Sequence, residues 1–451
     1  MMKRSLAVAG AAVLLLAGCG TSGSSEPEAA GGGGSATIDY WLWDTAQQPQ
    51  YQACADAFHK ANPQYNVKIT QYGWDDYWST LTTAFVSGTA PDVFTGHLSR
   101  YPEFAAQGQL MPIDDFVAKD KVDLSIYQDG LADLWVTKEG KRYGLPKDFD
   151  TVAVIYNTKM LKDAGIKPEE MSKLSWNPQD GGTYEKVIAR LTVDKNGKRG
   201  DEPGFDKTKV ATYGIGSNGS GGGFGQTEWS MYTMSNGWQY GDQNPWPTKF
   251  NYADPKFKET IKWFTGLIEK GYMPSLDIVN SGVGMIDSYG AGKYAMVTEG
   301  SWNTKTFFSL KDVKSGIAPT PIGPTGKRAS LFNGLADNIT ASTDNPEASW
   351  AWVKFLASPA CQEEIVAKQA TVFPAIKTAT AKAEQAFADA GIDVKAFTVH
   401  VDEGTTHLAP IAEHWADITA TMTETMEAIF SFKSDVNALD QANETVNGLF
   451  G

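Results

Sequence analysis

Aromatic side chains stand beside small polar residues at several places in this chain, a combination suited to binding a flat ligand that carries hydroxyl groups. The 451 residues include 14 Trp, 17 Tyr and 21 Phe. Many adjoin Gly, Asn or Asp, as in Trp41-Leu42-Trp43-Asp44, Tyr72-Gly73-Trp74-Asp75, Asn236-Gly237-Trp238 and Gly300-Ser301-Trp302-Asn303. Tryptophans in such loops are poor core material, whereas their faces stack on partly apolar rings while neighbouring polar groups bond hydroxyls. These residues therefore favour a pyranose sugar as the ligand.

Side chains for metal or thiol chemistry are scarce. The five histidines are dispersed, and the sequence contains neither CxxC nor HExxH. After Cys19 only Cys54 and Cys361 remain. Zinc sites need closely spaced Cys and His ligands, so we expect no metal centre and no cofactor. The stretch Asp194-Lys195-Asn196-Gly197 faintly resembles a calcium loop, but its Gly comes too early and no Glu stands at position twelve, which favours a hairpin turn.

The N-terminus predicts a lipid anchor. Lys3 and Arg4 precede an apolar run that is too short to span a bilayer, and the step Leu16-Ala17-Gly18-Cys19 resembles a bacterial lipobox. The prediction is a signal peptide over 1–18, lipidation of Cys19 and a flexible Gly- and Ser-rich tether over 19–36. An ordinary secretory signal with a chance Cys is the alternative. We expect an extracytoplasmic protein that is anchored to the cell membrane by an N-terminal lipid (palmitate).

The composition excludes several classes of partner. Removal of Lys3 and Arg4 takes the formal charge from -14 to -16. An acidic surface disfavours nucleic acid and anionic lipid. The chain left after cleavage is too long for one compact core and suits two lobes of ordinary domain size.

A strand–helix alternation opens the folded part. The patterns predict strands over 37–43, 66–72 and 91–95, and helices over 50–62, 75–87 and 101–106. This rhythm predicts an α/β fold with a mostly parallel sheet and helices on both faces. Ligands bind outside the carboxyl ends of such strands, where Trp43, Asp44 and the loop from His97 to Tyr101 would lie.

A second set of elements follows two turn-rich segments. Gly144 to Asp148 is interpreted as the first crossing between lobes, before a strand over 152–156. Pro319 to Pro324 is interpreted as a second hinge. Helices are predicted over 183–191, 254–270, 286–291 and 345–357, and a last helical region over 415–432 closes the chain.

Several stretches, in this order behind a lipobox, make the chain resemble family 1 extracellular solute-binding proteins, the sugar-binding lipoproteins of ABC importers. They are Phe58-His59-Lys60-Ala61-Asn62-Pro63, Gly88-Thr89-Ala90-Pro91-Asp92-Val93, Gly108-Gln109-Leu110-Met111-Pro112-Ile113, Tyr143-Gly144-Leu145-Pro146-Lys147-Asp148-Phe149-Asp150, Tyr156-Asn157-Thr158-Lys159-Met160-Leu161, Gly292-Lys293-Tyr294-Ala295-Met296, Gly300-Ser301-Trp302 and Asn345-Pro346-Glu347-Ala348-Ser349-Trp350. The resemblance implies the two-lobed periplasmic-binding-protein fold with a ligand cleft between the lobes. It implies an N-terminal lobe of 37–146 and 325–374, and a C-terminal lobe of 147–324 and 375–451.

The resemblance also implies the ligand-binding residues. Carried over position by position, they are Trp43, Asp44, Ser99, Arg100, Lys147, Asp148, Asp150, Gln226, Trp238, Ser301, Trp302, Asn333, Gly334, Asp337 and Trp415. Ser99 stands where relatives have Asp. Gln226 and Thr227 replace a carboxylate and an aromatic of maltose binders, so the ligand is not expected to be maltose held by the same contacts.

Structural interpretations stand beside these roles. Trp43 could simply cap the sheet, Asp150 could pair with Lys147, and Arg100 could be a solvated surface residue. The contexts of Trp302 and Trp415 are the least typical of a core.

The resemblance places Cys54 and Cys361 in the same lobe. In an oxidising compartment they would form a disulfide; two buried free thiols are the alternative. The implied partners are a mono- or oligosaccharide and the permease subunits of the importer, with the chain itself a monomer and not an enzyme.

Two other functions remain open at this point. A surface glycoside hydrolase would also display tryptophans and would need two carboxylates across the cleft, which Asp44 and Asp150 could supply. A passive glycan adhesin would not need two hinged lobes.

Overall fold

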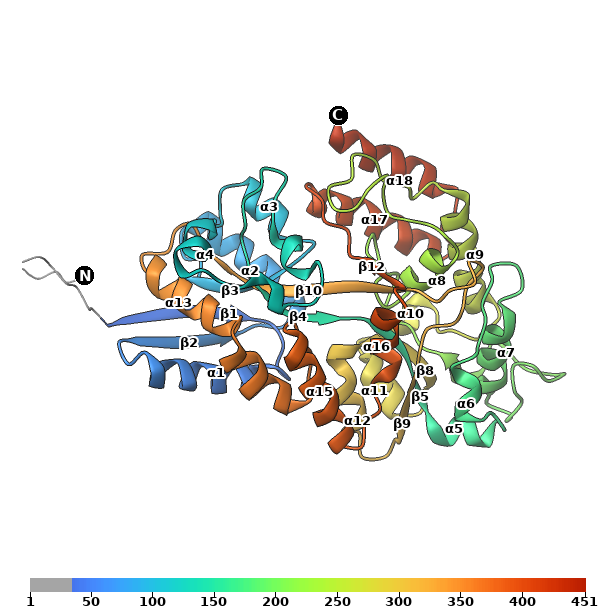
Figure 1. Cartoon of the computed structure of the whole chain (residues 1–451). Helices are drawn as coiled ribbons and strands as arrows, with labels where there is room; N and C mark the ends of the chain where they lie inside the picture. Colours follow the sequence, from blue (N-terminus) through green and yellow to red (C-terminus); the bar gives the residue numbers. More distant parts are fainter. Residues whose placement is uncertain (1–34) are drawn as a thin grey trace, which may run out of the picture. The chain divides into compact units, whose positions relative to one another are not determined.

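The computed structural model describes residues 35–451, which form one compact unit built around two sheets (Figure 1). The predicted signal peptide, the lipidation site Cys19 and nearly all of the tether lie outside the described residues. Within residues 35–451, no helix has the length and apolar character that a membrane crossing needs.

Twelve strands make up the two sheets of the described part of the chain. Their bounds are β1 (Ala36–Leu42), β2 (Tyr65–Gln71), β3 (Val93–His97), β4 (Pro146–Asp150), β5 (Val152–Asn157), β6 (Val193–Asp194), β7 (Val210–Ile215), β8 (Tyr294–Gly300), β9 (Ser315–Ala318), β10 (Ser330–Ile339), β11 (Phe373–Pro374) and β12 (Thr406–Leu408).

The α-helices have the following bounds: α1 (Gln48–Ala61), α2 (Trp74–Ser87), α3 (Tyr101–Ala106), α4 (Asp114–Asp120), α5 (Thr158–Asp163), α6 (Pro168–Met171), α7 (Gly182–Leu191), α8 (Ser230–Ser235), α9 (Pro255–Glu269), α10 (Leu276–Val279), α11 (Met285–Gly290), α12 (Thr304–Phe308), α13 (Pro346–Leu356), α14 (Pro359–Cys361), α15 (Lys377–Asp389), α16 (Lys395–Asp402), α17 (Trp415–Phe430) and α18 (Ala438–Asn447). Short turns of other helix types are η1 (Leu124–Ile126), η2 (Leu131–Trp135), η3 (Ser301–Asn303), η4 (Gln362–Val366), η5 (Ala367–Gln369) and η6 (Gly448–Phe450).

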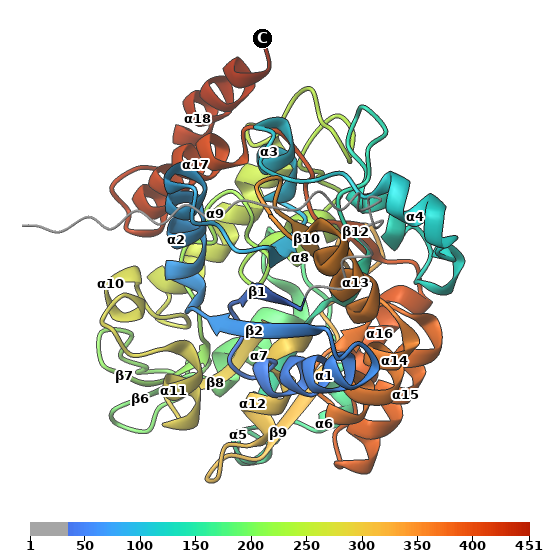
Figure 2. The ribbon, with the colours of Figure 1, turned by 90° about the vertical axis from the view of Figure 1, so that its left-hand side faces the viewer.

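The first sheet has the strand order β11-β4-β10-β3-β1-β2, with β12 beside β10. Helix α1 lies on one side of β1 and β2, and α2 lies on the other side (Figures 1 and 2). The buried residues Tyr51, Cys54 and Phe58 of α1 recur at helical spacing, which gives the helix one apolar face. Gly88 ends α2 in the left-handed conformation, with φ of 72°, which a residue without Cβ adopts at little cost. We call the elements packed on this sheet the first lobe.

The second sheet has the order β6-β7-β8-β5-β9 and forms the second lobe with the helices around it. Figure 1 shows α5, α6 and α7 at one end of this lobe, and α17 and α18 near the C-terminus. The last helical region predicted from the sequence is 415–432. The structure shows a further helix, α18, whose buried Leu439, Ala442 and Val446 pack in the same core as α17. Its apolar residues recur every three or four positions and predict a helix that the sequence analysis did not consider.

The fold class is confirmed, but the expected mostly parallel pairing is not. Strand β1 pairs with β2 and β3 in parallel, and β7 pairs with β8 in parallel. The strands that carry the chain between the lobes run the other way: β10 is antiparallel to β3 and β4, and β5 is antiparallel to β8 and β9. Both sheets are therefore mixed, because a strand that enters a sheet from the other lobe does not return through a crossover helix.

Two strands connect the lobes directly. Only Thr151 separates β4 of the first sheet from β5 of the second. Strand β10 pairs with β4 and β3 over Asn333 to Ile339, and with β12 over Ser330 to Phe332. Figure 1 shows β4 and β10 running side by side toward the second lobe. The predicted crossing at 144–148 thus lies a few residues before the actual one.

Hydrophobic packing moves one domain boundary from its expected place. The sequence analysis assigned 375–451 to the second lobe. Ala379, Ala383 and Phe387 of α15 and Phe397 of α16 instead belong to the first core. Only from Ala412 onward does the last segment join the second core. The chain therefore crosses back later than expected, because α15 has an apolar face that fits the first core.

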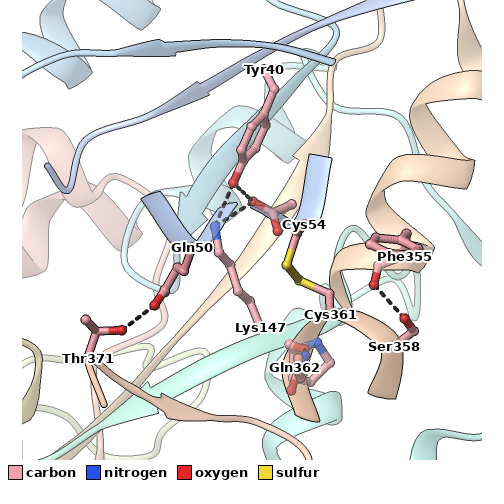
Figure 3. The surroundings of a disulfide bond; sticks show 11 residues. Tyr40, Gln50, Cys54, Lys147, Phe355, Ser358, Cys361, Gln362 and Thr371 are labelled. Carbon is pink, nitrogen blue, oxygen red and sulfur yellow. Dashed lines mark hydrogen bonds and ion pairs between the residues drawn. A yellow bond between two sulfur atoms is a disulfide. The ribbon is translucent and has the colours of Figure 1, made fainter. Parts of the chain in front are cut away.

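Cys54 and Cys361 form a disulfide in this structure (Figure 3). Cys54 lies on α1, Cys361 ends α14, and both side chains are fully buried. The bond joins residues 307 positions apart and fixes the returning segment to the beginning of the first lobe.

Candidate functional site

A cavity of about 680 Å³ lies between the two lobes and is lined by residues from both sheets. From the first lobe the lining residues are Trp43, Asp44, Thr45, Ala46, Gln47, Trp74, His97, Ser99, Arg100, Asp148, Phe149, Asp150, Asn333, Leu335 and Val372; from the second they are Asn218, Gly221, Phe224, Gly225, Gln226, Thr227, Glu228, Glu299, Ser301, Trp302, Asn303, Thr306, Trp415 and Thr419. The cavity lies at the carboxyl ends of β1 and β3, where ligands of open α/β sheets bind. A volume of this size fits a small organic ligand.

The first lobe contributes a cluster of aromatic side chains. The ring centroid of Trp43 lies 5.2 Å from that of Trp74 and 5.4 Å from that of Trp78. Trp43 also meets Tyr77 edge-on. These contacts hold the Trp43 ring in a fixed orientation, while Trp74 keeps 46% of its surface exposed. Trp43 therefore both packs against the sheet and lines the cavity, so the two interpretations of this residue are compatible.

Phe224, Trp302 and Trp415 line the cavity from the second lobe. The Phe224 ring meets Trp415 edge-on at 6.1 Å and meets His97 of the first lobe at 5.8 Å. Trp302 is half-buried, whereas Trp415 is only 2% exposed and also packs in the second core. Rigid aromatic faces on both sides of a cavity suit a flat ligand with apolar faces.

Asp150 is held by neighbours from both lobes. Gln226 Nε2 donates to Asp150 Oδ1 at 2.6 Å, and Asn333 Nδ2 donates to Asp150 Oδ2 at 3.2 Å. Asn333 Nδ2 also lies 3.0 Å from His97 Nε2, and His97 Nδ1 lies 2.8 Å from Ser99 Oγ. Burial holds the pKa of His97 down to about 3, so this imidazole is neutral and takes part as a hydrogen-bonding group.

The carboxyl groups of the cavity are difficult to ionise. Burial raises the pKa of Asp148 to about 7 and that of Glu299 to about 7. Burial, followed by the charge of Asp148, raises the pKa of Asp150 well above its ordinary range. Burial also raises the pKa of Glu228 and of Asp44. The wall is thus rich in acceptors whose charges oppose one another.

Arg100 is the cation that lines this cavity among the described residues. Its guanidinium lies 5.5 Å from the centroid of the Trp78 ring, and burial lowers its pKa from the usual value. Arginine stacked on an aromatic ring keeps its planar donors directed along the ring plane. A surface role for Arg100 does not fit this partly buried position.

Three buried oxygen atoms in the cavity wall have no hydrogen-bond partner in the structure. They are Asp148 Oδ2, Ser301 Oγ and Asn333 Oδ1, and the exposed fraction of each residue is 3% or less. Unpaired buried polar atoms are costly in a protein without a ligand. All three belong to residues that line the cavity.

The structure brings together eleven of the residues that the sequence proposed. They are Trp43, Asp44, Ser99, Arg100, Asp148, Asp150, Gln226, Ser301, Trp302, Asn333 and Trp415. The remaining four do not line the cavity.

Lys147 and Asp337 form a buried ion pair beneath the cavity rather than in it. Lys147 Nζ donates to Tyr40 Oη at 2.6 Å (Figure 3). It also lies 3.1 Å from Asp337 Oδ1 and donates to Thr95 Oγ1 at 2.9 Å. All three ammonium protons therefore have partners. Both side chains are 2% exposed and neither lines the cavity; in this structure they fix β4 against β1, β3 and β10.

Trp238 and Gly334 have structural roles as well. Trp238 is 2% exposed in the second core, where its ring nitrogen donates to Asn251 O at 2.8 Å. At Gly334 a Cβ would come within 3.0 Å of Leu131 Cδ1 and 3.2 Å of Asp148 O. A small residue is required there because β10 packs closely against its neighbours.

Several lining residues were not proposed from the sequence. The main ones are Gln47, Phe224, Glu228 and Glu299. His97 and Trp74 also line the cavity; they lie in segments that the sequence had marked without naming these two as site residues. Phe224 and Glu228 each lie two positions from Gln226, so this loop does present an aromatic and a carboxylate. Trp74 lies within the aromatic stretch Tyr72-Gly73-Trp74-Asp75, and Glu299 directly precedes Gly300-Ser301-Trp302. The Gly-rich stretch from Ser217 to Gly225 is typical of a loop, but its composition does not indicate which of its side chains point inward.

Within residues 35–451, no group of three or more His, Cys, Asp or Glu side chains is arranged to hold a metal ion. The site consists of aromatic faces, carboxyl groups, amides and one guanidinium. Such a set binds a polar organic molecule by stacking and hydrogen bonding.

Comparison with known proteins gives a consistent result. The family described as bacterial extracellular solute-binding protein matches residues 43–363. The maltodextrin-binding protein MdxE of Bacillus subtilis is 24% identical over 80% of this chain and 78% of its own length. A galactooligosaccharide-binding protein of the same organism is 24% identical over 96% of this chain and 94% of its own length.

The fold also matches solved structures. An ABC substrate-binding protein of Listeria monocytogenes, Lmo0181, solved in complex with cycloalternan, superposes with a TM-score of 0.78 at 20% identity. The match covers 92% of this chain and 98% of that protein.

Proposed function

Because the chain belongs to the bacterial extracellular solute-binding protein family, we propose that it binds a mono- or oligosaccharide in the cavity between its lobes and delivers it to the permease of an ABC importer. The observation that carries this proposal is the composition of the cavity wall. Aromatic faces from both lobes stand beside buried oxygen atoms that lack partners. A pyranose offers a ring face for stacking and hydroxyls for these oxygens.

The named relatives support a carbohydrate rather than another solute. The relatives compared above are named for maltodextrin and galactooligosaccharide, and the Listeria protein was solved with cycloalternan. The loop around Gln226 supplies Phe224 and Glu228 to the cavity, so an oligosaccharide that contacts both lobes is the proposed ligand.

The mode of action follows from the two lobes. A ligand that contacts both lobes stabilises the closed arrangement, since it gains contacts there that an open form lacks. The strands β4 and β10, which connect the lobes, are the proposed hinge region. In this proposal the chain acts as a monomer, with a first lobe of 37–150, 333–397 and nearby loops.

We further propose that Cys19 carries the lipid that anchors the protein outside the cytoplasmic membrane, with the tether over 19–36 as spacer. Replacement of Cys19 by Ser would release the protein from the membrane fraction. Metabolic labelling with a palmitate analogue tests this directly: label on the wild type and none on Cys19→Ser is the expected result.

A thermal-shift screen against mono- and oligosaccharides tests the sugar-binding proposal. A ligand that binds only the folded state raises the melting temperature by mass action. We expect at least one sugar to give a dissociation constant of about 1 µM or below, which corresponds to about -8 kcal/mol. Product analysis of the same mixtures separates binding from hydrolysis, the alternative that Asp44 and Asp150 left open. The absence of any sugar-induced shift would contradict the proposal.

A further inference from the structure

The charges that face the cavity are strongly unbalanced. Its wall contains five carboxyl groups, those of Asp44, Asp148, Asp150, Glu228 and Glu299, against one cation, Arg100, among residues 35–451. Lys147 lies outside the wall, with its three ammonium protons bonded to Tyr40, Thr95 and Asp337. Its charge lowers the pKa of Asp148, whereas that of Asp337 raises it, so Lys147 offsets only part of the excess.

The charges of these carboxyl groups act on one another. Apart from burial, which acts most strongly on each, the charges of Asp148 and Glu299 both raise the pKa of Asp150. The charge of Asp44 raises the pKa of Asp148, and that of Glu228 raises the pKa of Glu299. Neighbouring carboxylates of this kind cannot all ionise without a counter-charge.

The hydrogen-bonding partners of these groups leave one acceptor open. Asp44 accepts from Gln47, Asp150 from Gln226 and Asn333, and Glu228 from Thr227. In contrast, Asp148 Oδ2 is buried and has no donor. Asn333 Oδ1 and Ser301 Oγ in the same wall are also without partners. A ligand that satisfies this wall must bring more donors than acceptors.

A neutral hydroxyl and a protonated amine differ in what they offer such a wall. A hydroxyl donates one hydrogen bond but brings no charge, so it does not help a buried carboxyl group to ionise. An ammonium group donates three hydrogen bonds and supplies the missing positive charge. Since a buried charge is costly without a partner, the ammonium is favoured at this position.

From this wall we infer that the preferred ligand is a sugar that carries a protonated amino group, placed against Asp148 and its neighbouring carboxyl groups. This inference rests on the proposed function, because the aromatic faces of Trp43 and Trp302 are what select a sugar ring. It narrows the ligand to the class of amino sugars and their oligomers.

Matched pairs of ligands test the inference. Glucosamine and glucose, galactosamine and galactose, mannosamine and mannose, and β-1,4-linked diglucosamine and cellobiose are titrated by calorimetry at about pH 6. Each monosaccharide pair differs by one ammonium in place of a hydroxyl, and the disaccharide pair differs by two. We expect the amino form to bind about 10- to 100-fold more tightly in every pair that binds, the scale of one charge-assisted hydrogen bond. Added salt should reduce this preference.

Variants test which carboxyl group is responsible for the tighter binding of amino sugars. Asp148→Asn should reduce the ratio between amino and neutral forms by about tenfold, while the affinity for the neutral sugar changes less. Asp129→Asn is the matched control, because it changes the net charge equally but lies on an exposed residue outside the cavity wall. If Asp148→Asn fails to fold, Glu299→Gln provides the same comparison from the second lobe.

The outcomes separate this inference from the proposed function. Neutral sugars that bind as tightly as their amino counterparts would overturn the inference and leave the proposed function standing. Spermidine, included as an amine without a sugar ring, should not bind more tightly than the amino sugars. Binding of spermidine with no binding of any sugar would overturn both the inference and the proposed function, and so would the absence of binding by every probe.

Discussion

Some side chains of the cavity provide surfaces for stacking, and others provide groups for hydrogen bonding. Trp43 is held by Trp74, Tyr77 and Trp78, so its ring is ordered before a ligand arrives. Trp302 is half-buried at the opposite wall. Rings ordered in advance lose little conformational entropy on binding, and their contribution to affinity is correspondingly large.

Replacement of Trp302 by Ala should weaken sugar binding by about 1–3 kcal/mol, roughly 5- to 150-fold, because a large aromatic face is lost from the ligand. Titration calorimetry with the sugar that gives the largest thermal shift measures this change. The melting temperature of the free protein should change little. Unchanged affinity would contradict the stacking role of Trp302.

Trp238 provides the matched control in the same lobe. It is 2% exposed in the second core and does not line the cavity. Trp238→Ala should lower the free energy of unfolding by about 3–5 kcal/mol through loss of buried surface and the cavity left behind. Sugar affinity of the folded fraction should stay within about twofold. Urea unfolding and calorimetry together distinguish the two tryptophans.

The buried acid Glu299 gives the cavity a defined pH response. The pKa of Glu299 is about 7 in the folded protein, above its value of about 4.3 in an unfolded chain. The folded state therefore binds more protons between these values, and the free energy of unfolding falls as pH rises from about 4.5 to about 7. Burial of neutral His97 and His400, whose pKa is lowered to about 3 in each case, acts in the opposite direction.

Comparing the stability of wild type with that of Glu299→Gln separates the effect of Glu299 from the effect of the histidines. The stability of wild type relative to Glu299→Gln should fall between about pH 4.5 and about pH 7 and level off above that range. Urea unfolding of both proteins at a series of pH values measures this difference. Parallel stability curves would show that Glu299 has an ordinary pKa in the folded state.

At the scale of elements, β4 links the core of the first lobe to the cavity. Asp148, Phe149 and Asp150 of this strand line the cavity, whereas the neighbouring Lys147 does not and instead pairs with Asp337. The resemblance marks the whole segment and therefore placed Lys147, Asp148 and Asp150 at one site. Only the packing of β4 against β1, β3 and β10 separates Lys147 from the other two.

Lys147→Met should lower the free energy of unfolding by about 3–5 kcal/mol, because it leaves the buried carboxylate of Asp337 without its partner. The double variant Lys147→Met with Asp337→Asn should recover part of that loss, since no buried charge remains unpaired. Urea unfolding of the single and double variants gives both values. A single variant as stable as wild type would refute the structural role of the pair.

Much of the first lobe was predictable from local pattern. Helix 50–62 was expected and α1 covers Gln48–Ala61, because its apolar spacing and Pro63 are unambiguous. Residues that line the cavity were predictable mainly where they follow the end of a strand, as Trp43 and Asp44 do. Phe224, Glu228 and Glu299 were not, because their positions depend on how a long Gly-rich loop and the second sheet approach the first. The later crossing back, between Ile411 and Ala412, similarly depends on tertiary packing of α15 and the segment after it.

At the scale of the whole molecule, the disulfide between Cys54 and Cys361 links two segments of the first lobe that are far apart in the sequence. It joins two segments of the same hydrophobic core, and therefore leaves the connections β4–β5 and β10 free to bend. Closure of so long a loop stabilises mainly by restricting the unfolded chain.

Removal of this bond, by Cys54→Ala with Cys361→Ala, should lower the free energy of unfolding by about 2–4 kcal/mol and leave sugar affinity within about twofold. Thiol titration of the unfolded, unreduced Cys19→Ser protein checks the bond itself. No free thiol is expected; two free thiols would exclude it.

The central claim is that a sugar occupies the cavity between the lobes, and a crystal structure of the protein grown with the sugar that gives the largest thermal shift tests it most directly. The account predicts density for a pyranose ring against Trp302 or Trp43, with a donor group of the sugar on Asp148 Oδ2. Density for the sugar at another surface, with the cavity empty, would contradict it.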